Sequence, residues 1–406
     1  YAGIVLNDVE EITVGAALSG TNNFNNSLYG IKSTNSSLKL INNTFSDIWD
    51  NSTSPTQGTA VHAVSDFDQN DRFLIAGNGF GNGTNIFKEA MNGIYTEGEM
   101  NIDINKNTFG NSLAVNDRLL KYSIGIKRCG NKSILIDKDN SFYDYNYGVW
   151  IENDRDYKQL LIHDNDFFNY YDYPREPWQA RSFSGSAITA INYIPTTLTN
   201  AEISLNTIGN SNTTPIQQAR IGIRAANMER IRILDNRTYF NHATPPDDIF
   251  TGIFLQNCHN ARMNINDVIN VNGAFPAGSF GTLTGLRIHN SNSTCIENSI
   301  LTGLGFSMNF HGISVVKSLY TNTMTNFDTS ICLVTADIGT PQGSATNVLN
   351  NRWVRNNLSN NTTGRVEGST YSGGQIDWYH QGIVNSSDEF LPYSAGGIVI
   401  PNQASS

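Results

Sequence analysis

A short phrase of residues recurs along most of the chain and restricts the fold more than any other feature. It consists of a small residue, an aliphatic residue and a few alternating positions before a turn, as in Gly30-Ile31-Lys32 and Gly93-Ile94-Tyr95. Successive phrases between residues 3 and 333 are mostly 23 to 35 residues apart. This alternation is typical of short strands, and no helical period of 3.6 residues competes with it. One unit cannot bury its apolar face alone, so successive units must stack.

A second phrase follows each of the first about ten residues later and ends in an aromatic or aliphatic anchor, as in Leu40–Phe45 and Ile102–Phe109. Stacking pairs equivalent strands in parallel about 4.8 Å apart. It should therefore align an inner row of isoleucines, for which the phrases give Ile31, Ile94, Ile126, Ile223 and Ile253. It should also align a row of turn asparagines whose amides bond one another, namely Asn43, Asn107, Asn165, Asn236 and Asn298.

These rows predict an all-β chain folded as a right-handed parallel β-helix of about twelve coils over residues 1–335. Beyond residue 335 the rhythm breaks, and residues 336–406 are expected to form an irregular β-rich cap or the start of a following module. The phrase at Gly3 already belongs to a complete coil. We therefore expect the amino-terminal coil to stack on a neighbour, either a second copy of the chain or a continuation of the same polypeptide.

The repeat resembles that of the pectate-lyase-like superfamily of right-handed β-helices, and more specifically the Asn-rich repeat proteins secreted by Bacteroidota. The resemblance covers roughly residues 1–335 and implies a secreted or cell-surface location. It implies no single activity, because that superfamily includes lyases, hydrolases, epimerases, phage tailspikes and adhesins.

Charge and composition exclude some partners. The net charge of −10 and the lack of a basic run disfavour nucleic acid. The same charge weighs mildly against a strongly anionic polysaccharide, although a local cationic patch could override it. No stretch approaches the roughly 20 apolar residues of a helical membrane span.

The four cysteines are scattered through the chain without the spacing of a zinc site, and we expect neither a metal nor a cofactor. They are best interpreted as small apolar residues buried in the stack. A single bridge between Cys258 and Cys295 remains an alternative.

Side chains that follow the inner isoleucines should point outward, because successive strand residues face opposite sides. The resulting face mixes rings, cations and carboxylates, as surfaces that bind sugars do. The candidate glycan-binding residues are Tyr95, Glu97, Lys127, Trp150, Glu152, Arg224, Phe254 and Arg287. An ordinary solvated sheet face, with side chains paired across strands, is the alternative.

A long insertion after residue 168 packs aromatic residues and prolines together, and long loops on rigid scaffolds often carry function. Its candidate binding residues are Tyr171, Tyr173, Arg175 and Trp178.

We predict no catalytic residue. Glu97 and Glu152 should lie two coils apart, about 9.6 Å, which is too far for a retaining glycosidase and at the upper edge for an inverting one. The acidic run 152–156 could hold calcium, but an acidic turn is more often simply solvated. The sequence thus favours a non-enzymatic surface protein, an adhesin or a structural module of an appendage. The alternative is a polysaccharide lyase or inverting glycoside hydrolase acting at the Tyr95–Arg287 face.

Overall fold

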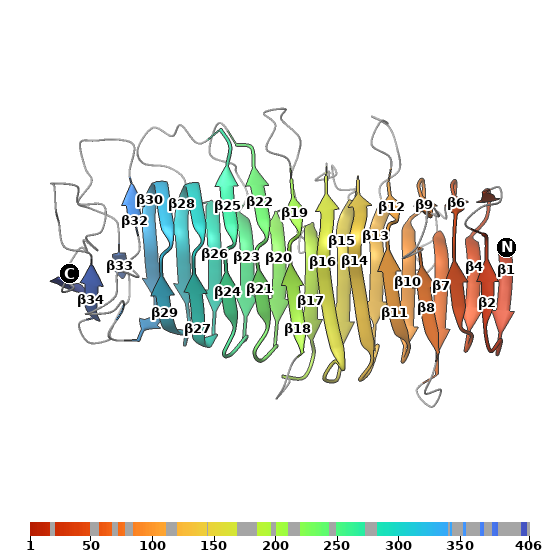
Figure 1. Cartoon of the computed structure of the whole chain (residues 1–406), viewed down its shortest axis with the longest axis horizontal. Coiled ribbons are helices and arrows are strands. Elements are labelled where there is room, and N and C mark those ends of the chain that lie inside the picture. Colours follow the sequence, from red (N-terminus) through yellow and green to blue (C-terminus); the bar gives the residue numbers. More distant parts are fainter. Residues whose placement is uncertain are drawn as a thin grey trace. The chain divides into compact units, whose positions relative to one another are not determined.

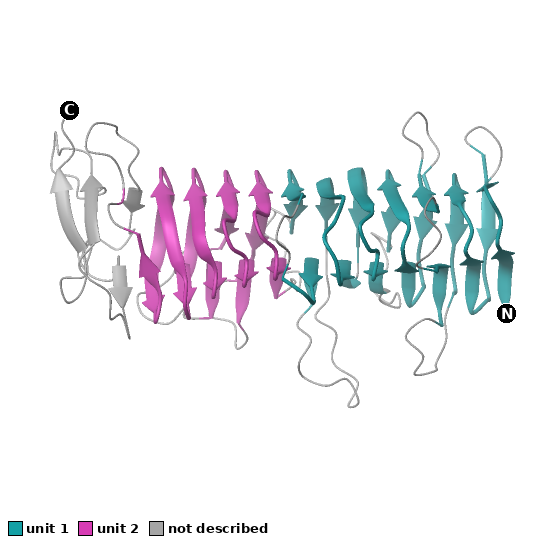
Figure 2. Ribbon diagram, turned by 90° about the horizontal axis from the view of Figure 1, so that it is seen from below, with its two compact units in different colours: residues 1–209, 216–219 teal, residues 210–215, 220–406 magenta. Residues whose placement is uncertain are grey.

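The computed structural model describes most of the chain. The described residues are 1–16, 21–48, 57–66, 72–77, 84–110, 120–143, 145–168, 185–195, 200–209, 220–242, 249–272, 282–339, 342, 352–354, 366–368, 376–380 and 399–403. The chain divides into two compact units, shown in Figure 2. Unit 1 contains residues 1–209 and 216–219, and unit 2 contains residues 210–215 and 220–406.

Unit 1 is built from short strands that form three parallel series. Figure 1 shows successive strands of a series side by side. The first series contains β1 (Ala2–Asn7), β4 (Tyr29–Thr34), β7 (Thr59–Ser65), β10 (Asn92–Gly98), β13 (Leu120–Lys127), β15 (Tyr145–Asn153) and β17 (Ser186–Asn192). The second contains β2 (Ile12–Val14), β5 (Leu38–Leu40), β8 (Phe73–Ala76), β11 (Asn101–Asn105), β14 (Ser133–Phe142), β16 (Gln159–Phe167) and β18 (Ala201–Ser204). The third contains β3 (Asn22–Phe24), β6 (Asn43–Phe45), β9 (Ile86–Phe87), β12 (Thr108–Phe109), the ends of β14 and β16, and β19 (Thr207–Ile208).

Unit 2 repeats the three series. The first contains β20 (Ile221–Ala226), β23 (Phe250–Gln256), β26 (Leu283–His289) and the ends of β28 (Ile300–His311) and β30 (Thr323–Val334). The second contains β21 (Arg232–Leu234), β24 (Arg262–Asn264), β27 (Asn292–Glu297), β29 (Val315–Tyr320) and β31 (Asp337–Ile338). The third contains β22 (Arg237–Phe240), β25 (Asp267–Asn270), the starts of β28 and β30, and β32 (Arg352–Val354).

The remaining strands are β33 (Val366–Gly368), which pairs in parallel with β30, and the parallel pair β34 (Ile376–His380) and β35 (Val399–Gln403). Parallel pairing is therefore present on both sides of residue 335, and the boundary at that position stays a prediction.

We call one strand of each series, with the turns between them, a coil. The described residues form no helix, so none of them offers a helical membrane span. An all-β chain of mostly parallel strands fits a parallel β-helix, as the repeat predicts.

The inner row of the first series confirms the predicted stacking and corrects its register at one coil. Ile31, Ile94 and Ile188 are fully buried members of this row in unit 1, and Ile223 pairs with Ile253 in unit 2. The predicted member Ile126 is wrong, because Ile124 pairs with Ile94 instead. Both isoleucines point inward, and a two-residue period cannot distinguish them.

The residue that opens each phrase is small because it lies close to the next coil, and at Gly30 there is no room for a side chain. A Cβ added to Gly30 would lie 2.6 Å from the ring of Phe45 and 2.6 Å from the carbonyl oxygen of Ala60 in the next coil. The phenylalanines of the third series in unit 1 stack on one another, with ring centroids 4.4 to 5.0 Å apart. The stack is Phe24, Phe45, Phe87, Phe109, Phe142 and Phe167.

The asparagine row also exists, with more members than predicted. Each side-chain amide donates to the amide oxygen of the next coil at 2.8 to 3.1 Å, through Asn43, Asn85, Asn107, Asn140, Asn165 and Asn206 in unit 1 and through Asn236 and Asn266 in unit 2. The predicted Asn298 is wrong. It occupies the left-handed turn position before the row, with φ of 54°, and Ser299 takes the buried place beside it.

All four cysteines are free thiols, so the alternative of a Cys258–Cys295 bridge is wrong. Cys129 and Cys258 are fully buried as predicted, and burial raises the pKa of the Cys258 thiol to about 11. Cys295 and Cys332 are only partly buried, because they lie on outward-facing strand positions.

Candidate functional site

The outward side of the first series in unit 1 carries a cluster of aromatic side chains. Ring centroids of neighbouring members lie 4.5 to 6.2 Å apart, through Tyr29, His62, Tyr95, Tyr122, Tyr147 and Trp150. We call these six residues the aromatic cluster.

Two members of the aromatic cluster were expected to be open to solvent, and that expectation is wrong. Tyr95 is 2% exposed and Trp150 is 7% exposed. The rings cover one another, and Gly125 leaves room for the Tyr95 ring to lie over the next coil, where an added Cβ would approach it to 2.8 Å. Stacking of equivalent strands brings such rings close enough to contact, which a single phrase does not reveal.

A row of charges runs beside the aromatic cluster. Glu97 in β10, Lys127 in β13 and Glu152 in β15 occupy equivalent positions of three successive coils. Lys127 was expected in the row of Tyr95, but the register of β13 places it between the two carboxylates. Its Nζ lies 3.8 Å from Oε2 of Glu152 and 5.8 Å from the centre of the Tyr95 ring. The row therefore alternates in sign from one coil to the next.

Tyr193, which follows β17, completes this site and was not predicted. Its side chain is 61% exposed and hydrogen-bonds to Glu152. Burial and then this bond raise the pKa of Tyr193, and burial raises the pKa of Tyr95 and of Tyr122 to about 12. All three phenols are therefore neutral at physiological pH and can donate hydrogen bonds. Tyr193 lies just past the strand phrase, so the alternation gave no reason to place it on this face.

Nearby, burial and the charge of Lys127 lower the pKa of Lys121. The site on unit 1 thus contains one exposed ring, three neutral phenols and side chains of both charges. Such a set can exchange hydrogen bonds with ligand hydroxyls in both directions.

The outward side of the first series in unit 2 contains the other predicted binding residues. Arg224, Phe254 and Arg287 occupy equivalent positions of β20, β23 and β26. The two guanidinium carbons lie 5.8 Å and 5.3 Å from the centre of the Phe254 ring. Arg224 also donates to Oε1 of Gln256 at 3.4 Å.

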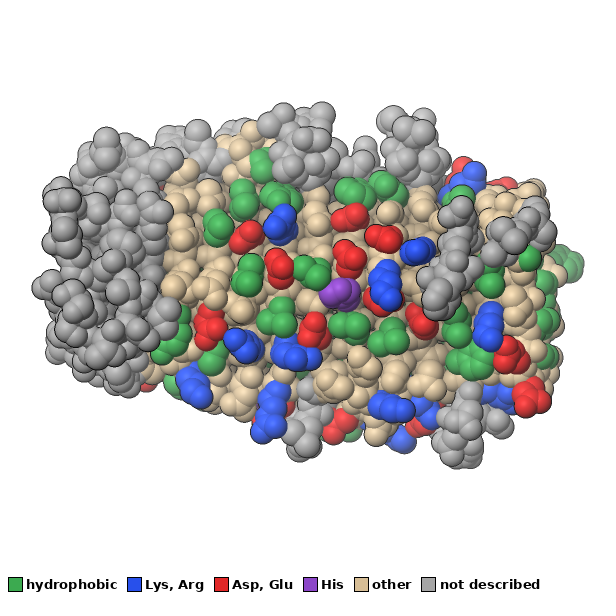
Figure 3. Space-filling model, in the orientation of Figure 1, with side chains coloured by type: hydrophobic (Ala, Val, Ile, Leu, Met, Phe, Trp, Pro, Cys, Tyr) green, Lys and Arg blue, Asp and Glu red, His purple; other side chains and the backbone are tan. Residues whose placement is uncertain are grey.

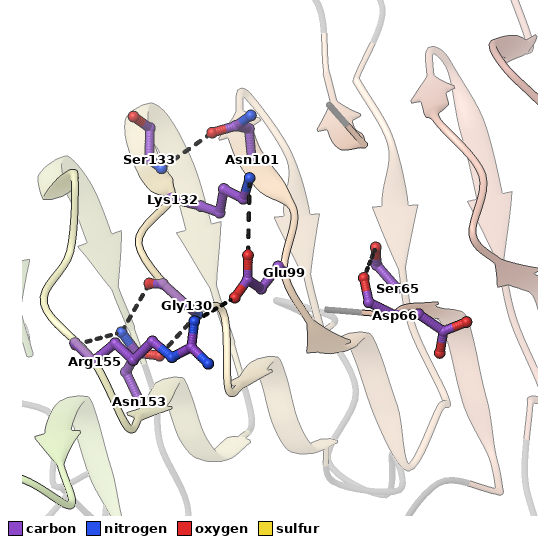
Figure 4. A network of polar contacts seen from close by, with 9 residues as sticks. All are labelled: Ser65, Asp66, Glu99, Asn101, Gly130, Lys132, Ser133, Asn153 and Arg155. Atoms are coloured by element: carbon purple, nitrogen blue, oxygen red, sulfur yellow. Dashed lines mark hydrogen bonds and ion pairs between the residues drawn. The ribbon is translucent and has the colours of Figure 1, made fainter. Parts of the chain in front are cut away.

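A polar network at the turn after the first series ties three coils of unit 1 together (Figure 4). The buried Glu99 accepts from Arg155 at 2.9 Å and lies 3.9 Å from Lys132. Asn153 accepts from the amide of Gly130 at 3.0 Å and donates to its carbonyl at 3.1 Å. Because these hydrogen bonds and ion pairs join residues of different coils, the network stabilises the packing of one coil on the next. Of the acidic run 152–156, Asn153 and Arg155 belong to this network.

Acidic side chains gather near the middle of the face shown in Figure 3. In the second series of unit 1, the Ser204 hydroxyl donates to Glu202 at 2.7 Å and lies 3.0 Å from Nδ1 of His163. Burial, followed by the nearby carboxylates Asp103 and Asp164, raises the pKa of Asp137. Within the described ranges, no three potential ligands converge as a metal site would require.

The predicted loop residues Tyr171, Tyr173, Arg175 and Trp178 lie outside the described residues. Comparison with known proteins does not identify the chain: no family model matches it, and no curated protein is significantly similar to it.

Proposed function

We propose that this chain is a non-enzymatic bacterial β-helix, secreted or displayed at the cell surface, that acts as an adhesin or structural module and holds a glycan. The glycan would contact unit 1 at Tyr193 and at the charge row Glu97–Lys127–Glu152. The observation that carries this proposal is the exposed ring of Tyr193 beside Glu152. A tyrosine ring offers an apolar face and a polar tip, which suits the C–H faces and hydroxyls of a sugar.

The geometry of the charge row favours binding of a glycan over its cleavage. A general acid and a general base need different proton affinities and a suitable spacing on either side of the bond to be cleaved. Here Glu152 is paired with Lys127, and Glu97 lies two coils away, about 9.6 Å in strand spacing. Tyr95 and Trp150 are buried, so in this proposal they support the site from beneath.

The handedness of the β-helix, its number of coils and its relatives are part of the same proposal. We infer a right-handed helix of about twelve coils, related to the pectate-lyase-like superfamily and to the secreted Asn-rich proteins of Bacteroidota. Support comes from the asparagine row, the phenylalanine stack and a chain with only 15% charged residues. A polar, weakly charged and repetitive surface is suited to extended contact outside the cell.

A glycan array probed with the full chain tests the proposal, followed by titration of the strongest ligand. We expect Tyr193→Ala to weaken binding about tenfold, equivalent to roughly 1.4 kcal/mol. Ile194→Ala is the matched control, because the neighbouring Ile194 is 62% exposed and lacks an aromatic ring; it should change affinity less than twofold.

Equal losses in the two variants would contradict a specific role for Tyr193. The enzyme alternative is tested on the same ligands by measuring released reducing ends. Release by the wild-type chain that disappears in Glu152→Gln, while binding persists, would replace the binding proposal with a hydrolase or lyase.

A further inference from the structure

The outer face of unit 2 carries charge of a single sign. It is formed by β20, β23, β26 and the segments 306–311 and 329–334, and these described segments contain no aspartate or glutamate. Their titratable side chains are Arg224, Arg287, His289, His311 and Cys332. The chain as a whole has a net charge of −10, so this face differs in sign from the molecule that carries it.

Phe254 orients the two arginines of this face. It lies between them in the row, with its ring centre 5.8 Å from the guanidinium carbon of Arg224 and 5.3 Å from that of Arg287. Both cations can therefore stack on one ring, which restricts their motion before any ligand arrives. With both sides of the ring next to guanidinium groups, Phe254 positions the cations rather than stacking on a sugar.

Arg287 has no anionic partner. Its contact with Phe254 is its only ring, ion-pair or hydrogen-bond contact with the described part of the chain, and its Nε is buried without an acceptor. Burial lowers the pKa of Arg287. Elsewhere Arg262 pairs with Glu297 at 3.5 Å, and Arg155 pairs with Glu99 at 2.9 Å. A half-buried cation without a counter-charge is costly to maintain and often marks a functional site.

Two histidines extend the face. His289 and His311 occupy equivalent positions of adjacent coils, in the outward row that also contains Gln256. Burial, followed by the charges of Arg287 and His289, lowers the pKa of His311 below its usual value of 6.5. At neutral pH His311 is therefore mostly uncharged, whereas the two guanidinium groups stay positive.

We propose that this face binds the oxyanion groups, carboxylates or sulfates, of an acidic glycan. The planar guanidinium fork matches such groups with two parallel hydrogen bonds. Arg224 and Arg287 lie two coils apart, about 9.6 Å in strand spacing. This separation suits two charges on one polymer better than a single small anion. The inference names a ligand class for unit 2 and does not depend on the Tyr193 site of unit 1.

Three dextrans that differ only in charge test the proposal: dextran sulfate, carboxymethyl dextran and neutral dextran, each immobilised and probed with the full chain by biolayer interferometry at physiological salt. We expect binding to one or both charged dextrans and none to the neutral one. A preference between sulfate and carboxylate identifies the source of the oxyanion.

Arg287→Gln should weaken binding to the preferred polymer about tenfold or more, because it removes a charge-assisted bidentate contact. Arg262→Gln removes the same charge from an exposed site in the same unit and should change affinity less than twofold. Arg287→Lys keeps the charge but loses the fork, and should weaken binding severalfold without affecting the fold.

Equal effects of Arg287→Gln and Arg262→Gln would overturn the proposal and indicate nonspecific attraction to a polyanion. Equal binding to all three dextrans that Arg287→Gln leaves unchanged would also overturn it. Loss of binding in Tyr193→Ala alone would point to unit 1 instead, so the failure of this inference is distinguishable from that of the proposed function.

Discussion

Unit 1 and unit 2 fill the same position of the coil with different side chains. In unit 1 the residue two places after each ladder asparagine is mostly phenylalanine, and these rings stack. In unit 2 the equivalent residues are Thr238, Val268, Leu301 and Met324. The glycine at the bend is nevertheless retained, since a Cβ on Gly252 would lie 2.6 Å from Val268, much as one on Gly30 would lie 2.6 Å from Phe45. The coil thus needs a small residue facing an apolar one, and aromatic stacking is an addition specific to unit 1.

The outer faces differ in the same way. Unit 1 combines rings with charges of both signs, whereas unit 2 places two arginines around one ring without a carboxylate in the described strands of that face. One scaffold can therefore present two chemically distinct surfaces. Substitutions at equivalent positions of the two units can show whether the same interactions stabilise each unit.

The largest expected difference concerns the phenylalanine stack. Phe109 is fully buried between Phe87 and Phe142, with centroids 4.7 and 4.9 Å away. Phe109→Ala should lower the free energy of unfolding by about 3–5 kcal/mol through lost burial and a cavity. Val268→Ala in unit 2 removes less volume and should cost about 2 kcal/mol. Urea unfolding followed by circular dichroism measures both, and equal costs would show that the stacked ring of Phe109 stabilises unit 1 no more than Val268 stabilises unit 2.

The second difference is a pH dependence of stability that originates from His62 in unit 1. Burial, followed by the charge of Lys32, lowers the pKa of His62 to about 4. The unfolded chain then binds more protons than the folded one, so this stability is complete above pH 6.5 and is lost as pH falls towards about 4. The loss attributable to His62 should reach about 3 kcal/mol.

His62→Phe keeps a ring between Tyr29 and Tyr95 and removes the titrating group. Unfolding free energies of the wild type and this variant should therefore diverge between pH 6.5 and pH 4. Parallel curves would show that His62 takes up its proton without disturbing the cluster.

The smallest expected difference concerns the asparagine row. Asn140 is fully buried and donates to the carbonyl of Ile104 at 3.0 Å and to Asn165 at 2.8 Å. Asn140→Ala leaves these buried acceptors short of a donor and should cost about 2 kcal/mol. Ser299→Ala, at the equivalent place in unit 2, removes one hydroxyl and should cost about 1 kcal/mol. Thermal unfolding of both variants compares the two losses of stability. A larger loss in Ser299→Ala than in Asn140→Ala would contradict a stabilising role of the asparagine row.

The sequence predicts the stack well because every coil needs the same residue types at the same positions. A small residue, an inward aliphatic residue and a turn asparagine recur together, and each requires the same residue type in the next coil. The repeat does not distinguish Ile124 from Ile126, since both face inward on one strand. It also does not distinguish Asn298 from Ser299, since asparagine suits the left-handed turn as well as the row.

The candidate site was less predictable, for a different reason. Alternation assigns Tyr95 and Trp150 to the outward side. Whether these rings are buried depends on the direction in which large side chains extend over neighbouring coils. The exposure of Tyr193 depends on the path of the chain after β17, where no repeat applies. Arg287 was identified as a surface cation, but its lack of a partner becomes apparent only when neighbouring strands are placed beside it.

The parallel pairing within unit 1 also has a mechanical consequence. The backbone hydrogen bonds that join Ile94, Ile124 and Val149 point from coil to coil, and the amides of Asn107, Asn140 and Asn165 add one bond to each step. Tension along the stacking direction is therefore carried in series, with the same force on every junction between coils. The junction with the fewest bonds sets the breaking force of the unit, while the folded coils on either side of it remain intact.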